Sequence, residues 1–146
     1  MTAEELIEML HLSPHPEGGW YRETWRSAAK DRGRAAATAV YYVLPRTPSS
    51  PWNRVDADEI WLWHAGDPID LMIADTNEGP IRTIRLGGAI DRGEQPQVIV
   101  PAGHWQSAAT ASGAEAGYTF LSCIVAPAFE FSGYELAPPG WTPGQD

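Results

Sequence analysis

Short runs of β-forming residues, each closed by a turn rich in glycine or proline, follow one another along most of this chain and limit its possible folds. About ten such runs lie between positions 18 and 137, at the spacing of roughly 8–12 residues that is typical of β-sandwiches and barrels. The 14 glycines and 13 prolines are spread along the chain, so they indicate frequent turns. The sequence therefore predicts an all-β fold. A jelly roll or small barrel is favoured because it closes or covers its edge strands, but the pattern alone leaves an immunoglobulin-like sandwich open.

One segment, at positions 1–12, has the pattern of an α-helix. Thr2 and Glu5 match a capping box, in which the hydroxyl and the carboxylate each bond a free backbone amide at the helix start. The helix should end before Pro14, since the residue ahead of a proline resists helical angles. Three apolar residues share one face of this helix by their spacing: Leu6, Met9 and Leu10.

The length of 146 residues fits one domain, so we expect a single domain over 1–146. The last nine residues, 138–146, contain three prolines and two glycines and should form an irregular tail.

The charge and cysteine content limit the possible partners and location. A net charge of -9 repels phosphate backbones, which argues against nucleic acid. The first ten residues are acidic where a signal peptide needs basic ones, and no apolar stretch approaches about 18 residues, so we expect no membrane contact. Cys123 is the single cysteine and lies in an apolar run, which favours a buried, inert thiol and a cytoplasmic protein.

An acid lies among large aromatic rings in the run DEIWLWHAG. Glu59, Trp61 and Trp63 share one face of the expected strand, because side chains alternate between faces. If that face lines a barrel interior, loss of water raises the pKa of Glu59 above its ordinary value of about 4.3 and suits it to acid–base chemistry. If the face points outward, Glu59 is a solvated surface acid, and the pattern leaves both open.

The segment SPHPEGGWYRE is a second candidate region. Its simple interpretation is a turn, because Pro16 fixes φ and the following Gly18 and Gly19 permit unusual angles. The functional interpretation is that this loop aims Arg22 or Glu23 into a cavity, where a guanidinium would suit a carboxylate or phosphate on a ligand. Surface ion pairing is the alternative for both side chains.

The histidines carry weaker signals. His64 ends its strand, a position that is more often structural or exposed than catalytic. His104 follows a proline–alanine–glycine turn and is a candidate for the border of a pocket. His11 and His15 have no partner that the sequence reveals.

Five blocks occur in chain order: SPHPEGGWYRETWRS, TAVYYVLP, NRVDADEIWLWHAGDP, PQVIVPAGHWQSA and CIVAPAFEFSGYELA. They resemble the small cupin family classed as a domain of unknown function, the cupin-five-like proteins, from about Leu6 to Ala137. The resemblance implies a double-stranded β-helix, which is the cupin jelly-roll barrel, and usually a homodimer. It implies no settled activity.

Cupins in general carry two metal-binding blocks, and the resemblance aligns both with this chain. The first has two histidines one residue apart, a glutamate, and a glycine seven residues later. Here the glutamate is Glu59 and the glycine is Gly66, while the histidine positions fall on Asn53 and Val55.

The second cupin block runs proline-x-glycine and then histidine. It aligns with Pro101 and Gly103, and Gln106 takes the histidine position. The resemblance thus implies that Asn53, Glu59 and Gln106 converge inside the barrel. Glu59 is thus the one good metal ligand among four usual positions, since neutral amides bind transition metals weakly. We predict no metal cofactor, or a loosely bound metal.

The resemblance and the candidate residues lead to a small-molecule-binding protein with three possible functions. The first is a metal-independent isomerase-, epimerase- or cyclase-like enzyme. Metal-free cupins resemble sugar-nucleotide epimerases and isomerases, which use an acid–base pair inside the barrel. Glu59 is then the predicted base and Tyr42 the candidate acid, and His104 takes part if it reaches inward.

The second possible function is a binding module without turnover for a nucleotide-like or planar molecule. Asn53 and Gln106 would hydrogen-bond the ligand, Arg22 would bind an anionic group, and aromatic rings would stack on the ligand. These rings belong to Trp61, Trp63 and Tyr42. The third is a metal-dependent dioxygenase, against which the missing histidines count.

Seven tryptophans are many for a barrel of this size, and exposed aromatic area often marks an interface. We therefore expect a homodimer. The strand GGWYRETWRS is the candidate interface, because end strands most often lack a partner within their own sheet.

Overall fold

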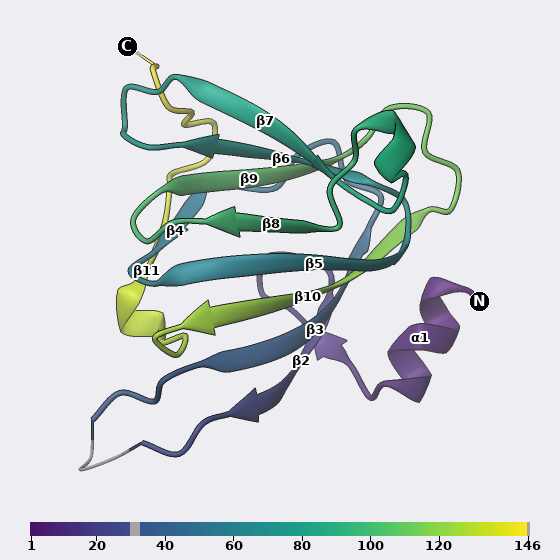
Figure 1. The fold of residues 1–146 in the computed structure, drawn as a ribbon, viewed down its shortest axis with the longest axis horizontal. Helices are drawn as coiled ribbons and strands as arrows, with labels where there is room; N and C mark the ends of the chain where they lie inside the picture. Colours follow the sequence, from purple (N-terminus) through teal and green to yellow (C-terminus); the bar gives the residue numbers. More distant parts are fainter. Residues whose placement is uncertain (30–32, 146) are drawn as a thin grey trace.

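A computed structural model describes residues 1–29 and 33–145 of the chain. Its strands form two antiparallel sheets that pack around a common interior, and helix α1 lies outside them beside β3 (Figure 1). The predicted all-β architecture with one short amino-terminal helix is confirmed.

The first sheet has six strands in the order β1-β2-β3-β10-β5-β8. Its strands, in that order, are β1 (Ser13–Pro14), β2 (Trp20–Arg26), β3 (Thr38–Pro45), β10 (Tyr118–Ala126), β5 (Asp58–Gly66) and β8 (Gln97–Val100). The second sheet has five strands in the order β11-β4-β9-β6-β7. Its strands are β11 (Tyr134–Leu136), β4 (Asn53–Val55), β9 (Trp105–Thr110), β6 (Ile69–Ala74) and β7 (Ile81–Leu86).

Helix α1 spans Ala3–Met9 and begins with the predicted capping box. Thr2 Oγ1 accepts the Glu5 backbone N–H at 3.1 Å, and the Glu5 carboxylate accepts the Thr2 N–H at 3.4 Å. Leu6 is buried against β3, but Met9 is 65% exposed.

One expected strand is shorter than the sequence suggests. In FEFSGYELA, the last of the runs of β-forming residues, Phe131–Gly133 forms a 3₁₀ turn, η2, and only β11 pairs with β4. A second 3₁₀ turn, η1, spans Ile90–Arg92. The Gly133 backbone donates to the Glu130 carbonyl within the turn, which takes these residues out of the sheet ladder.

Apolar side chains from both sheets fill the half of the interior that lies between β6 and β10. Ile69, Leu71 and Ile73 of β6 and Leu121 of β10 have no exposed surface. Burial of side chains of this size stabilises a fold by about 1.5–3 kcal/mol each. This packed half holds the two sheets together and leaves room for a cavity at the other end of the interior.

The carboxyl-terminal residues 138–145 have no regular secondary structure and are docked on the barrel. Trp141 stacks on Trp105 with ring centroids 4.5 Å apart, and the Gly144 N–H donates to the Asn77 carbonyl at 2.7 Å. Position 146, where the predicted tail ends, lies outside the described residues.

None of the helices in residues 1–29 and 33–145 has the length and apolar character needed to cross a membrane. The cytoplasmic location stays a prediction.

Candidate functional site

A cavity of about 770 Å³ opens between the two sheets, at the end of the barrel where β5 begins. Its walls combine aliphatic and aromatic side chains with a few acids and amides, as small-molecule sites usually do. Its lining includes the following polar, charged and aromatic side chains: His15, Glu17, Glu23, Arg26, Tyr42, Asn53, Glu59, Trp61, Gln106, Cys123 and Glu130. We call this cavity the interior pocket.

Three of the predicted site residues meet at the bottom of the interior pocket. Gln106 Nε2 donates to Glu59 Oε1 at 2.8 Å and to Asn53 Oδ1 at 3.1 Å. Glu59 belongs to the first sheet, while Asn53 and Gln106 are register partners in the second. The predicted convergence of these three residues across the barrel is therefore confirmed.

The tryptophans of β5 lie on the inner face, as one of the two sequence interpretations required. Trp61 lines the interior pocket, and its indole N–H donates to Gln106 Oε1 at 3.1 Å. Trp63 lies two residues further along the strand, and its N–H donates to the backbone carbonyl of Asp67 at 3.2 Å. It lines a different cavity at the opposite end of β5, so the structure separates it from the other predicted ligand contacts.

Burial raises the pKa of the Glu59 carboxyl above its ordinary value, as the interior interpretation predicts. Hydrogen bonds from Gln106 and from the Cys123 thiol partly offset this rise because they stabilise the charged form. Cys123 is buried and free, and burial followed by the nearby Glu59 charge raises the pKa of its thiol. The thiol is therefore a hydrogen-bond donor to Glu59 and a poor nucleophile.

A second acid enters the interior pocket from the loop between β1 and β2. The loop is closed by a hydrogen bond from the His15 N–H to the Gly19 carbonyl at 2.9 Å. The Glu17 N–H donates to His15 Nδ1 at 3.1 Å, which fixes the proton of a neutral His15 on its other ring nitrogen. Gly19 has a φ of +82°, and an added Cβ would lie 2.7 Å from the Tyr42 ring, so only glycine allows the loop to approach β3 this closely.

The Glu17 carboxyl is poorly satisfied in its position. Its Oε1 is buried and has no hydrogen-bond partner. Burial, and secondly the charge of Glu59, raise the pKa of Glu17 to about 7. The two carboxyls are thus electrostatically coupled in one pocket, and like charges placed together disfavour ionisation of both.

Sequence reasoning missed Glu17. The segment that contains it was recognised, but Arg22 and Glu23 were chosen as the side chains that the loop aims inward. The sequence does contain a signal for Glu17. This acid lies between Pro16 and the pair Gly18–Gly19, and the proline and the glycines favour a tight turn. Which wall this turn faces depends on contacts with β3 that the local sequence does not encode.

Tyr42 lines the interior pocket, but its hydroxyl is already engaged. It donates a short hydrogen bond to the Gly18 carbonyl, and burial raises the pKa of the phenol well above its usual range. Both features make Tyr42 a weak proton donor to a ligand. Instead, Tyr42 contacts Gly18 and Gly19 and so holds the loop that carries Glu17 against β3.

Two other predicted site residues lie away from the interior pocket. Arg22 is exposed, with its guanidinium 5.9 Å from the Tyr41 ring on the outer face of the first sheet. Its neighbour Glu23 is the one that lines the pocket, where it pairs with Arg26 at 2.8 Å.

His104 is the second of these. It lies in the turn before β9 with its Nδ1 3.1 Å from Asp75, within ion-pair range but without hydrogen-bond geometry. The structure does not bring His104 to Glu59.

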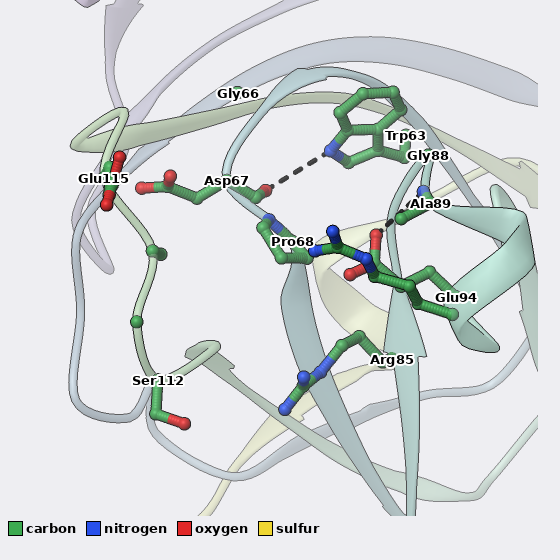
Figure 2. Close-up of a pocket in the computed structure, with 13 residues that line it drawn as sticks. Trp63, Gly66, Asp67, Pro68, Arg85, Gly88, Ala89, Glu94, Ser112 and Glu115 are labelled. Carbon is green, nitrogen blue, oxygen red and sulfur yellow. Dashed lines mark hydrogen bonds between the residues drawn. The ribbon is translucent and has the colours of Figure 1, made fainter.

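A second cavity of about 690 Å³ lies where β5 ends, and Figure 2 shows its lining. Here two of the acids, Asp67 and Glu94, are bonded to backbone amides. The Asp67 carboxylate accepts the backbone N–H groups of Ala116 and Gly117 at 2.7 and 2.8 Å. Glu94 accepts the Ala89 N–H at 2.9 Å (Figure 2). This cavity, which we call the terminal cavity, is held by structural contacts.

The residues at the aligned cupin ligand positions do not fit a firmly bound transition metal. Val55 offers no donor atom, and the amide nitrogen of Gln106 lies against both the Glu59 and Asn53 oxygens, so an N–H group takes the place where an ion would need lone pairs. No group of three His, Cys, Asp or Glu side chains suited to an ion occurs among residues 1–29 and 33–145. Weak or absent metal binding stays a prediction, which elemental analysis of chelator-treated protein tests.

The two sheets around an interior pocket with Glu59 at its floor define a cupin barrel, a double-stranded β-helix. The chain belongs to the family described as Cupin superfamily (DUF985), whose model matches residues 4–137. The resemblance seen in five sequence blocks is thereby confirmed.

Solved structures agree with this assignment. A hypothetical protein from Leishmania major is 35% identical, with a TM-score of 0.80 over 92% of this chain and 86% of that one. A protein from Shewanella oneidensis is also 35% identical, with a TM-score of 0.83 over 94% and 85%. Oxalate decarboxylase from Bacillus subtilis is 17% identical with a TM-score of 0.60 over 84% of this chain and 29% of that one, which is a likeness of fold alone. No curated protein matches this chain.

Proposed function

We propose that this chain is a small-molecule-binding cupin that moves a proton on its ligand, as an isomerase or epimerase, with Glu59 as the general base. The observation that carries this proposal is the pair of coupled carboxyls, Glu17 and Glu59, in a pocket with apolar walls. Carboxyls with raised pKa values accept protons effectively near neutral pH, which is the property that a general base needs.

Glu59 suits the base better than Glu17 does. Gln106 and Cys123 both donate hydrogen bonds to Glu59, which fixes its orientation and favours its charged form. Glu59 would take a proton from a carbon of the ligand and return one to the same or a neighbouring carbon. The composition of the ligand is unchanged in such a step, so neither an oxidant nor a second substrate is needed.

The test is deuterium uptake from heavy water. Chiral α-amino and α-hydroxy carbonyl compounds are incubated with the protein in D₂O, and incorporation at carbon is followed by proton NMR and mass spectrometry. We expect one compound class to exchange, and Glu59→Gln to slow exchange by about 100-fold or more because the base is gone while its shape remains.

Glu115→Gln is the matched control, since Glu115 is an exposed acid at the terminal cavity. It should exchange at the wild-type rate. A Glu59→Gln protein that exchanges as fast as the wild type would refute the role of Glu59.

A binding module without turnover is the second candidate, and the Asn53–Gln106–Glu59 contact favours it. These groups already satisfy one another, as in a site that shapes a ligand without reacting. Saturable binding of a compound from the same panel, with no deuterium uptake by any of them, would select this alternative. Affinity alone would then respond to Glu59→Gln.

A further inference from the structure

The charges around the interior pocket are unbalanced. Its acids come from four parts of the fold, namely the β1–β2 loop, β2, β5 and the segment after β10: Glu17, Glu23, Glu59 and Glu130. Two of these acids have basic partners: Arg26 pairs with Glu23 at 2.8 Å and bonds the Phe129 carbonyl at 3.0 Å, and Arg34 lies 3.9 Å from Glu130. Among the residues that the structure describes, Glu17 and Glu59 are in no ion pair. The lining therefore repels anions such as phosphates and carboxylates, and attracts cations.

Two buried polar atoms in the lining of this pocket have no hydrogen-bond partner: Glu17 Oε1 and the Tyr134 hydroxyl. Buried polar atoms are nearly always satisfied, and exceptions call for an explanation such as a missing ligand or ion. An ionised carboxylate can only accept hydrogen bonds, so an ionised Glu17 needs a hydrogen-bond donor at this oxygen.

The rest of the lining suits a cation that carries an apolar part. Tyr42 and Trp61 border the acids inside the barrel, and Phe129, Phe131 and Tyr134 form an aromatic group at the same cavity, with Phe129 and Phe131 centroids 5.1 Å apart. Aromatic faces attract organic cations and also bind apolar groups.

We propose that the interior pocket binds a small organic ammonium with an apolar or aromatic substituent, whose N–H groups bond the Glu17 carboxylate. The ammonium supplies the positive charge that the Glu17–Glu59 pair lacks and replaces the proton that the pair otherwise holds. This assignment rests on the proposed function for its catalytic meaning, because an ammonium next to a carbon makes that carbon a better proton donor to Glu59.

A matched series of three probes tests the charge preference directly: benzylamine, benzyl alcohol and benzoate, measured by titration calorimetry. They share one ring and differ in the charge of the attached group. We expect benzylamine to bind about tenfold more tightly than benzyl alcohol, and benzoate to bind more weakly than either. No measurable binding of benzylamine, or equal binding of benzylamine and benzyl alcohol, overturns the proposal.

The variant Glu17→Gln locates the subsite. It should lower benzylamine affinity to that of benzyl alcohol and leave benzyl alcohol unchanged, while Glu115→Gln keeps the wild-type preference. A Glu17→Gln protein that retains the full preference overturns the assignment to Glu17. The comparison of probes on the wild-type protein needs no variant, so it decides the charge preference even if the variant fails to fold.

The pH dependence of benzylamine affinity tests whether the bound cation replaces a proton on Glu17. Benzylamine affinity should rise several-fold from pH 6 to pH 8, since Glu17 must ionise, whereas benzyl alcohol affinity should stay constant. A flat pH profile for benzylamine counts against the exchange of proton for cation. The titratable and charged side chains that share the pocket with Glu17 are His15, Tyr21, Glu23, Arg26, Tyr42, Glu59, Cys123, Glu130 and Tyr134.

The results separate this inference from the proposed function. Preference for benzylamine without deuterium uptake by any compound supports the ammonium site and removes the isomerase. Deuterium uptake that Glu59→Gln abolishes, without a preference for benzylamine over benzyl alcohol, supports the isomerase and removes the ammonium site.

Discussion

The two ends of strand β5 open on cavities of similar size and opposite character. The interior pocket of about 770 Å³ receives Glu59 and Trp61, and the terminal cavity of about 690 Å³ receives Trp63 and Gly66. At the terminal cavity Asp67, Glu94 and other polar groups are bonded within the protein. At the interior pocket one carboxyl oxygen of Glu17 has no partner.

This difference separates a structural site from a functional one. Acids that are fully bonded within the protein stabilise the fold, while a buried acid without a hydrogen-bond partner lowers stability, and a bound ligand can recover that loss. Cavity volume alone does not distinguish the two ends. The hydrogen bonds of the acids at each end distinguish them.

Asp67→Ala should lower the free energy of unfolding most, by about 3 kcal/mol, because it leaves two backbone N–H donors, those of Ala116 and Gly117, without their charged acceptor. Urea unfolding followed by tryptophan fluorescence measures the loss. Asp91→Ala, an exposed acid in η1, is the control and should change stability by less than about 0.5 kcal/mol. If Asp67→Ala lowers the free energy of unfolding by less than about 1 kcal/mol, the hydrogen bonds of Asp67 at the terminal cavity do not have the structural role assigned to them.

Glu17→Gln should have the opposite sign and raise stability at pH 8 by about 1–2 kcal/mol. The pKa of Glu17 rises from 4.5 to about 7 on folding, so the folded chain binds more protons between these values and loses stability as pH rises through them. The magnitude allows for solvent screening, since Glu17 is only partly buried.

Unfolding at pH 4, 6 and 8 checks the Glu17 effect. The gain from Glu17→Gln should vanish at pH 4, where both states are protonated. Glu115→Gln should show no comparable pH dependence. A gain that is equal at pH 4 and pH 8 would mean that the Glu17 charge is not the cause.

Arg85→Gln at the terminal cavity should matter less than either. Arg85 bonds Asp70 on the neighbouring strand at 2.8 and 3.2 Å, but both side chains are partly exposed, and such ion pairs contribute about 0–1 kcal/mol. The loss should shrink further in 1 M salt, because salt screens exposed charges. Benzylamine binding should be unaffected. A change in binding would show that the two cavities are coupled.

The smallest effect on either cavity is expected from Trp25→Ser. We propose that the protein is a homodimer and that β2 is the interface. Among the described residues, β1 pairs only with Trp20 and Tyr21 of β2, and no other strand pairs with the rest of that edge. Trp25 is 53% exposed there. Light scattering should give twice the chain mass of 16.0 kDa for the wild type and a shift toward monomer for Trp25→Ser.

Stability of each Trp25→Ser chain should change by less than about 0.5 kcal/mol. Ile81→Ser, on the exposed strand β7, is the control and should remain dimeric. A wild-type protein that is monomeric at micromolar concentration removes the proposal, and with it the role of β2.

The local elements and several contacts of the candidate site could be predicted from the sequence. The capping box at Thr2 and the shared strand face of Glu59 and Trp61 depend on neighbours within a few residues, so local rules capture them. The convergence of Glu59 with Gln106 also came from the sequence, through a family resemblance that carries the fold with it.

Which face of each strand points into the barrel, and which side chains of the site come into contact, depends on the packing of the two sheets. Alternation along β2 says that Arg22 and Glu23 point in opposite directions, but packing of the first sheet decides that Glu23 faces the pocket. The Glu17 loop gains its role from contact with Tyr42, 25 residues later in the sequence. Burial and coupling to Glu59 set its pKa, and both depend on chain segments that are brought together only when the two sheets close.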